Sequence, residues 1–331
     1  MDIFLYNLRG IYFLLSSYCN PSYSLKYLYS LDDKTLEKIK RRVNYYCNFS
    51  TPPPYSKISL SKSPSYAPSS PFKILKKGSR YCYDFYEFMR FFNQDLYFHL
   101  ESGDVNYITK EPSFCKSRPI TSLPSNNIIL KLDKKRHFRF LDKKDLNLPY
   151  EDKIRGIFFR GGIYQENRKK FMRLFIHHPL CNVGHVGKPE SQELIQWQKS
   201  KSSISEHLKY KFIASLEGND VATNLKWIMS SNSIAVSPKL KFETWFMEGT
   251  LKPNQHFLCV KEDFSDLIEK IETLRDDEAK EMIHQANLYV KEFQNKKLEN
   301  LISFLVLKKY FYQTQQAKAS PLEEEIFKAS Q

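Results

Sequence analysis

The chain has 331 residues, of which 41% are apolar and 27% charged, so it is predicted to be a soluble globular protein of two domains and not a disordered or fibrous one. Its 51 basic and 37 acidic side chains give a net charge of +14. This excess suits an anionic partner, such as a nucleotide sugar, a phosphorylated glycolipid, a membrane surface or nucleic acid, and a lysine-rich protein without such a partner is the alternative. The six cysteines stand singly, with no CxxC or Cys/His cluster. That spacing argues against a structural zinc site or a disulfide framework and favours a reducing cytoplasm.

Residues 1–47 are predicted to be helical and part of the fold. The apolar run Ile11–Leu15 follows Arg9 and is too short to span a bilayer, and no signal-peptide cleavage pattern precedes Cys19. A helix whose aromatic side chains touch a membrane is the alternative. Residues 51–77 are rich in Pro, Ser and Tyr, and they predict an extended surface loop or, alternatively, a disordered tether.

An amphipathic helix over 81–93 and a strand over 96–100 follow, and the strand ends in Glu101-Ser102-Gly103-Asp104. An acidic residue at the carboxyl end of a strand lies where open α/β sheets bind their ligands, which makes Asp104 a candidate site residue. A solvated aspartate in a turn is the alternative. In the next loop, Lys116 and Arg118 could bind a pyrophosphate or an anionic acceptor, or be ordinary surface charges.

A strand over 128–132 precedes a dense basic run, residues 134–139, in which Phe138 lies among the cations and Phe140 follows. Basic and aromatic residues together suit single-stranded nucleic acid, but no RNP, KH or helix-turn-helix pattern surrounds this run. Binding of a phosphorylated lipid oligosaccharide is the interpretation we favour.

The second domain begins with a strand over 157–160, a Gly161-Gly162 turn and an amphipathic helix over 166–176. A glycine-rich loop over 183–187 follows. The apolar run 211–216 predicts a buried strand, the residues Glu217 to Asp220 predict a turn, and the periodicity predicts a helix from Val221. A strand that leads through a glycine turn into a helix N-terminus is a suitable anion site.

The remaining pattern predicts a strand over 233–236, a short helix over 242–247 and a strand over 256–260. Helices over 263–274, 276–293 and 298–311 follow, and the acidic segment Glu323–Glu325 is predicted to be a frayed tail. No HExxH or DxD metal motif is present.

The segments EGNDVATNLKW (217–227), SSNSIAV (230–236) and KFETWFMEG (241–249) resemble the C-terminal half of glycosyltransferase family 90, most of all its bacterial lipopolysaccharide branch. The resemblance is clear over 156–293 and weaker over 83–152. It implies an α/β fold of the GT-B type, with two Rossmann-like domains that face a cleft. Residues 1–152 would form the acceptor-side domain, 153–295 the donor-binding domain, and 296–331 a helix that crosses back to the first domain, with a tail.

The resemblance also implies roles for individual residues. Asp104 would be the catalytic base. Lys116 and Arg118 would lie on the acceptor or phosphate side. The donor nucleotide would be bound by a set of ten residues, namely Arg160, Gly161, Glu217, Gly218, Asn219, Asp220, Thr223, Asn224, Lys226 and Glu243. In this set Lys226 would neutralise the diphosphate and Glu243 would accept hydrogen bonds from the ribose.

The activity so implied is metal-independent and uses no cofactor. A UDP-sugar is the co-substrate, and glucose or galactose moves with inversion onto a lipopolysaccharide core sugar at the inner face of the cytoplasmic membrane. No nucleic-acid partner is expected. Capsule or protein O-glycosylation is the alternative within the class, and a nucleic-acid-binding protein or a catalytically inactive scaffold are alternatives outside it.

Overall fold

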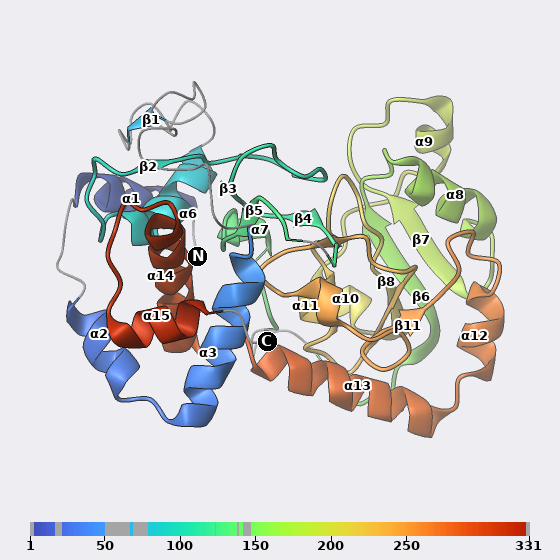
Figure 1. Ribbon diagram of the computed structural model, residues 1–331. Coiled ribbons are helices and arrows are strands. Elements are labelled where there is room, and N and C mark those ends of the chain that lie inside the picture. Colours follow the sequence, from blue (N-terminus) through green and yellow to red (C-terminus); the bar gives the residue numbers. More distant parts are fainter. Residues whose placement is uncertain are drawn as a thin grey trace. The chain divides into compact units, whose positions relative to one another are not determined.

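The computed structural model describes residues 3–16, 22–49, 67–68, 79–122, 124–137, 139–141 and 147–328. Figure 1 traces the elements along the chain, which divides into two compact units. Unit 1 comprises Met1–Phe138 and Asn295–Gln331, and unit 2 comprises Arg139–Gln294. Apart from Ala67–Pro68, which form strand β1, the loop predicted over 51–77 lies outside the described residues.

Unit 2 is built on a five-stranded sheet in the order β11-β9-β8-β6-β7, and every neighbouring pair is parallel. The strands are β6 (Ile154–Gly161), β7 (Cys181–His185), β8 (Tyr210–Ala214), β9 (Ile234–Ser237) and β11 (Leu258–Cys259). Parallel strands need helical crossovers that cover both faces, which is why these strands are nearly continuous apolar runs. The α/β prediction with a parallel sheet is confirmed here. The strand order reverses between β6 and β8.

Helices cover both faces of this sheet. On one face, α8 (Glu166–Phe175), α9 (Gln192–Gln196), α12 (Leu267–Thr273) and α13 (Asp276–Lys291) contribute to one core cluster with the strands. There Phe159 of β6 packs edge-on against Phe171 of α8, with ring centroids 5.9 Å apart. On the other face, Phe158 meets His207 of α10 (Ile204–His207), which in turn meets Trp227 of α11 (Leu225–Ile228).

Three local predictions in unit 2 are wrong. The helix predicted from Val221 is the single turn α11, which begins at Leu225. The segment predicted as a helix over 242–247 forms the short strand β10 (Phe242–Glu243), and the 3-10 turn η1 (Glu248–Thr250) follows it. The glycine-rich stretch 183–187 is a loop only after His185, because Gly184 pairs with Arg160 inside the parallel ladder of β6 and β7. At the first two places tertiary contacts override local periodicity, and at the third they draw a glycine into a strand.

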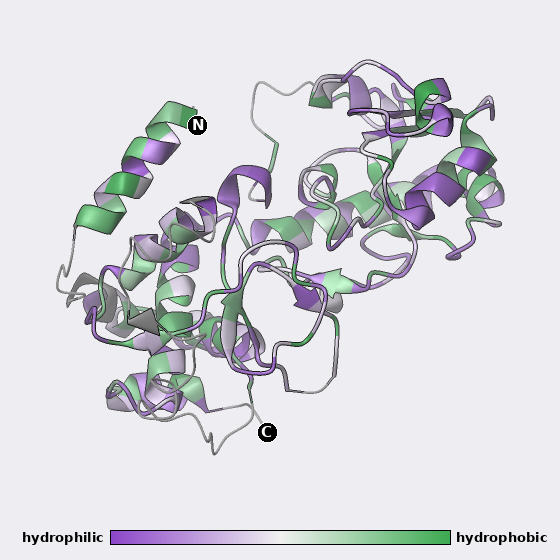
Figure 2. Cartoon of the chain, turned by 90° about the horizontal axis from the view of Figure 1, so that it is seen from above, coloured by the Kyte–Doolittle hydropathy of each residue, from purple (hydrophilic) through white to green (hydrophobic). Residues whose placement is uncertain are grey.

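Unit 1 is mostly helical in its described part. Its main helices are α1 (Ile3–Leu15), α2 (Ser22–Tyr29), α3 (Asp33–Tyr46), α6 (Ser79–Met89), α14 (Lys296–Gln313) and α15 (Pro321–Phe327). Short strands pair as β1 with β2 (Tyr97–Phe98), antiparallel, and as β3 (Ser113–Cys115) with β5 (Asn127–Ile129), parallel. The prediction that residues 1–47 are helical is confirmed for the part of that segment that the structure describes, which forms α1, α2 and α3. Figure 2 shows α1, the helix beside the N label, as hydrophobic over most of its turns.

The end of the chain contradicts the predicted frayed tail. Ser320 caps α15, its side chain accepts from the Glu323 N–H, and the Glu323 side chain accepts from the Ser320 N–H, which is a capping box with proline at the first helical position. Among the described helices, none is long and apolar enough to cross a membrane.

A buried charge cluster joins the N-terminal and C-terminal helices of unit 1. Glu299 of α14 accepts hydrogen bonds from both Arg42 of α3 and Lys131, and all three side chains are buried. Helix α14 also packs against α6, and Phe92, just after the end of α6, stacks on Phe304 of α14 with ring centroids 4.9 Å apart. The C-terminal helix is therefore an integral part of unit 1.

Candidate functional site

The carboxyl ends of β6 and β8 form the point in unit 2 where a ligand site is expected. In open parallel sheets, ligands bind outside the carboxyl edge at the place where the strand order reverses. Here that place lies between β6, which ends at Gly161, and β8, which ends at Ala214. The segments that follow these two strands, residues 162–165 and 215–224, therefore form the candidate site.

One guanidinium occupies the middle of this edge. Arg168 of α8 donates from Nη1 to the Gly162 carbonyl at 2.9 Å, from Nη2 to the Leu216 carbonyl at 2.7 Å and from Nε to the Glu217 carbonyl at 3.2 Å. Burial lowers the pKa of Arg168 below its ordinary value, and the Asp220 carboxylate opposes that shift. An arginine stays charged at neutral pH even so. A mostly buried cation therefore joins the ends of both strands.

Gly218 leaves room for this cation. A Cβ atom at Gly218 would lie 3.1 Å from Arg168 Nη2, closer than ordinary van der Waals contact. The preceding carboxylate, Glu217, accepts from the backbone N–H groups of Lys241 and Phe242 and so holds the next loop in place. Burial raises the pKa of Glu217 to about 7, although those two hydrogen bonds favour its charged form. The turn predicted over Glu217–Asp220 therefore lies beside Arg168 and is held there by hydrogen bonds to Arg168 and to the loop at Lys241.

Arg160 and Gly161 come from the last two positions of β6. The Arg160 side chain donates to the Phe159 and Asn182 carbonyls and to Asn182 Oδ1, and it stacks on the Phe158 ring with its Cζ 4.4 Å from the centroid. These contacts hold it over β7. Burial also lowers its pKa. The expected bidentate contact of Arg160 with a phosphate would require these bonds to be exchanged.

His185 ends β7 and is fully buried. Its Nδ1 accepts the Ile163 N–H at 3.1 Å, so the neutral ring carries its proton on Nε2. Among the described residues, Nε2 has no hydrogen-bond partner. A buried donor of this kind is one that a bound ligand can satisfy.

Asn224 and Lys226 lie deeper than the sequence indicated. The Asn224 side chain donates to the Ala214 carbonyl and accepts from Ser215 Oγ, so it fastens α11 to the end of β8. The Lys226 ammonium is fully buried, 2.8 Å from Glu248 Oε1, and it lies over the Trp245 and Phe246 rings. Glu248 also accepts from the Thr244 N–H and hydroxyl. Asn224 and Lys226, which were predicted to contact the donor nucleotide, are therefore both bonded to other groups of the protein.

The other predicted donor residues divide between surface and core. Asn219 and Thr223 are exposed, and Asn219 Oδ1 accepts from Gln165 across the turn. Asp220 is buried, and its carbonyl accepts the Gly218 N–H, which closes the turn. Glu243 is buried, and its Oε2 accepts from the Gly249 N–H. The turn 218–220 therefore presents backbone and amide groups beside Arg168.

Asp104 lies in unit 1 after Gly103, whose φ of +101° suits glycine. Its carboxylate accepts from the Lys116 ammonium at 2.5 Å, and Lys116 is itself fully buried and 3.3 Å from His137 Nε2. Arg136 approaches the same carboxylate at 4.0 Å. The Asp104 side chain keeps 31% of its surface exposed, so its carboxylate is open to solvent. Asp104 and Lys116, both singled out from the sequence, form one pair.

Arg118 and the basic run have defined contacts as well. Arg118 donates to the Asn127 and Tyr45 carbonyls and is buried, so it ties α3 to β5. Residues 134–137 form α7, a single turn. In it Lys134 pairs with Glu87, and Arg136 pairs with Asp133. Among the described residues, no group of three His, Cys, Asp or Glu side chains could hold a metal ion.

Comparisons with known proteins agree on one family. The model of glycosyl transferase family 90 matches residues 130–322. O-glucosyltransferase LpsA of Dichelobacter nodosus is 37% identical over 280 residues, which is 82% of this chain and 82% of that protein. This chain belongs to glycosyltransferase family 90. Protein O-glucosyltransferase 3 of Homo sapiens is 25% identical over 165 residues, 48% of this chain and 32% of that protein. The family indicated by the sequence is confirmed, and the glycosyltransferase uses a sugar donor and an acceptor.

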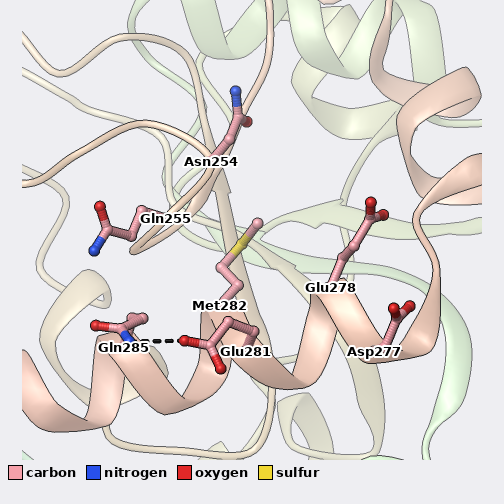
Figure 3. A pocket seen from close by; sticks show the side chains of 7 residues that line it. All are labelled: Asn254, Gln255, Asp277, Glu278, Glu281, Met282 and Gln285. Atoms are coloured by element: carbon pink, nitrogen blue, oxygen red, sulfur yellow. Dashed lines mark hydrogen bonds between the residues drawn. The ribbon is translucent and has the colours of Figure 1, made fainter.

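A cavity elsewhere in the glycosyltransferase does not suit such a donor. It measures about 460 Å³ and is lined by Asn254, Gln255, Asp277, Glu278, Glu281, Met282 and Gln285 (Figure 3). Three carboxylates line it, and they would repel a nucleotide diphosphate. Asn254 and Gln255 precede β11, so the cavity borders the amino end of that strand, away from the carboxyl edge that carries Arg168.

Arg168 is the residue that the sequence analysis of this glycosyltransferase missed. It opens the run Arg168-Lys169-Lys170, which reads as the solvated face of an amphipathic helix. The available signal was its place in the first turns of the helix after Gly161-Gly162. That place brings a long side chain back over the strand end, because helical side chains point toward the helix N-terminus.

Proposed function

We propose that this glycosyltransferase moves a hexose, glucose or galactose, from a UDP-sugar to a core sugar of lipopolysaccharide, with inversion at the anomeric carbon. The observation that supports this most is the Arg168 guanidinium at the point where the strand order of unit 2 reverses. The relative named O-glucosyltransferase LpsA, 37% identical over most of both chains, favours glucose.

In this proposal the leaving diphosphate binds at the carboxyl edge of unit 2. Arg168 offers positive charge there, and its three carbonyl partners fix the plane of the guanidinium before the donor arrives. A preorganised cation can stabilise charge as it develops on a leaving group without reorganising. Gly161, Gly218, Asn219 and Thr223 complete the surface around it. The donor is then held without a metal ion.

Asp104 is the proposed base. An acceptor hydroxyl has a pKa far above neutral, so it must lose its proton to a carboxylate as its oxygen attacks the anomeric carbon. The new glycosidic bond forms on one face of the sugar while the bond to the diphosphate breaks on the other, and UDP leaves with the electron pair. Lys116 positions the Asp104 carboxylate through their 2.5 Å contact.

We also propose the GT-B architecture for the two units and a location at the inner face of the cytoplasmic membrane, where lipid-linked acceptors are built. A net charge of +14 supports attraction to phosphorylated core oligosaccharide and to anionic lipid. Capsule or protein O-glycosylation is the second candidate. The similarity of this chain to protein O-glucosyltransferase 3 supports a protein as the acceptor.

The test is transfer from a panel of nucleotide sugars to purified lipopolysaccharide core, with the intact protein and Asp104→Asn compared. We expect Asp104→Asn to lose transfer by at least about a hundredfold, the lower range for a general base, while UDP affinity stays within twofold. Turnover retained by Asp104→Asn would place the base elsewhere. Transfer to a folded protein acceptor but not to core oligosaccharide would favour the second candidate.

A further inference from the structure

Helix α1 exposes a continuous apolar face. Seven of its apolar or aromatic residues are between 43% and 68% exposed. One is Ile3, and the other six are Phe4, Leu5, Leu8, Ile11, Tyr12 and Leu15. The spacing of three, four and seven among the six residues from Phe4 to Leu15 places those six on one side of the helix. A contiguous exposed apolar surface marks an interaction site. Figure 2 shows the same hydrophobic character along α1.

The opposite side of α1 already has a partner. Tyr6, Gly10 and Phe13 are buried against α6, and Gly10 allows the close approach because a Cβ there would lie 2.2 Å from the Tyr83 ring. The Tyr6 hydroxyl donates to the Arg80 carbonyl. One face of α1 therefore packs on α6 while the opposite face is exposed to solvent, and this exposure is a property of the folded protein.

The charge of the surroundings indicates what covers the exposed face. Unit 1 contains 27 of the 51 basic residues and 15 of the 37 acidic ones, which is +12 of the total +14. Arg9 is the one charged residue of α1 and pairs with Glu87 of α6, whereas Arg90 lies over the Tyr12 and Phe13 rings at the end of α1. The nearby acids of α6, Asp84 and Glu87, are buried. An apolar face with a basic flank suits an anionic lipid surface.

We propose that α1 binds the membrane by lying in the headgroup region of an anionic bilayer with its exposed apolar face inserted. Tyr12 would lie at the depth where aromatic rings are favoured, and Arg90 would meet lipid phosphates. Membrane binding by α1 would bring the enzyme to a lipid-linked acceptor, and only this consequence rests on the proposed function. A second copy of the chain is a poorer partner for this face, since it would bring two strongly basic units together.

The experiment is co-sedimentation of the full chain with vesicles that contain no acceptor. One set contains phosphatidylethanolamine and phosphatidylglycerol, and the other contains phosphatidylcholine alone. We expect binding to the first set and at least about tenfold weaker binding to the second. The variant Leu8→Ser/Leu15→Ser should lose at least about tenfold in binding to the anionic vesicles, because it removes apolar carbons from the inserted face.

The matched control is Leu174→Ser/Ile195→Ser, which removes two side chains of comparable exposure, 50% and 53%, from unit 2. It should bind vesicles like the intact protein. When anionic vesicles are added, the tryptophan emission of the Tyr12→Trp variant should shift to shorter wavelength by more than that of the intact protein. Melting temperatures and hydrolysis of UDP-sugar in solution should be unchanged in the α1 double variant, so that loss of vesicle binding is separated from misfolding and from failure of the proposed activity.

Two outcomes would overturn the proposal. Equal vesicle binding by the intact protein and by Leu8→Ser/Leu15→Ser would show that α1 does not carry the interaction. A lipid-free dimer that the same double variant converts to a monomer, with vesicle binding unchanged, would assign the face to self-association. Vesicle binding that depends on α1 in a protein that transfers no hexose would uphold the membrane site and refute the proposed activity alone.

Discussion

The substitution Arg168→Lys tests whether the guanidinium at the carboxyl edge of unit 2 serves the donor. Arg168 reaches three carbonyls of two segments, and a lysine ammonium cannot span Gly162 and Leu216 in the same fork geometry. At least two charge-assisted hydrogen bonds are lost. At about 1.5 kcal/mol each, the lower end for bonds to a charged group, the free energy of unfolding should fall by about 3 kcal/mol.

The same change should weaken donor binding. A lysine keeps the positive charge but not the planar fork, so the loss comes from geometry and from a less fixed head group. We expect the Kd for UDP to rise about ten- to a hundredfold, which corresponds to about 1.4 to 2.8 kcal/mol of binding free energy. Calorimetric titration with UDP gives the Kd, and thermal denaturation gives the change in stability.

Arg155→Lys is the matched control. Arg155 lies near the amino end of the same strand, β6, and also donates to two backbone carbonyls, those of Glu272 and Leu274. Its replacement should lower stability and leave the Kd for UDP unchanged. Gly218→Ala offers a second variant, since its methyl group would crowd Arg168 Nη2, and we expect a rise in Kd of about threefold or more. A folded Arg168→Lys protein whose Kd stays within twofold of the intact protein would refute the reasoning.

The sheet of unit 2 was readable from the sequence because its strands are short apolar runs bounded by turn residues. The predicted segments 157–160, 211–216 and 233–236 coincide with β6, β8 and β9 to within a few residues. The long helices α13 and α14 were readable for a different reason, because their helical spacing of apolar residues extends over several turns. Neither the strand order nor the place where it reverses follows from such local patterns.

The candidate site was harder to predict because its contacts join distant parts of the chain. Arg168 finds its carbonyl partners 48 and 49 residues away, at Leu216 and Glu217. Lys226 looked available to a phosphate, but Glu248 supplies a buried carboxylate for it 22 residues later. A lysine's hydropathy predicts exposure, and only the fold reveals that a partner is present. The capping box of α15 is different, because Ser320-Pro-Leu-Glu323 carries that signal locally.

Three further predictions follow from buried and capping groups. Ser320→Ala should lower the free energy of unfolding by about 1 kcal/mol by removing the cap of α15, as measured by chemical denaturation. Glu299→Gln should cost about 3 kcal/mol or more, because it leaves the Arg42 guanidinium buried without a carboxylate and removes the acceptor of Lys131, whereas a loss below about 1 kcal/mol would contradict that role. The last concerns pH. The folded-state pKa of Glu217, about 7, lies above its unfolded value near 4.5, so the folded protein binds the extra proton and its stability falls as pH rises through this window. Relative to Glu217→Gln, which cannot ionise, the intact protein should lose up to about 3 kcal/mol between pH 5 and pH 8. Parallel stability curves for the two proteins would mean that the backbone hydrogen bonds to Glu217 outweigh its burial.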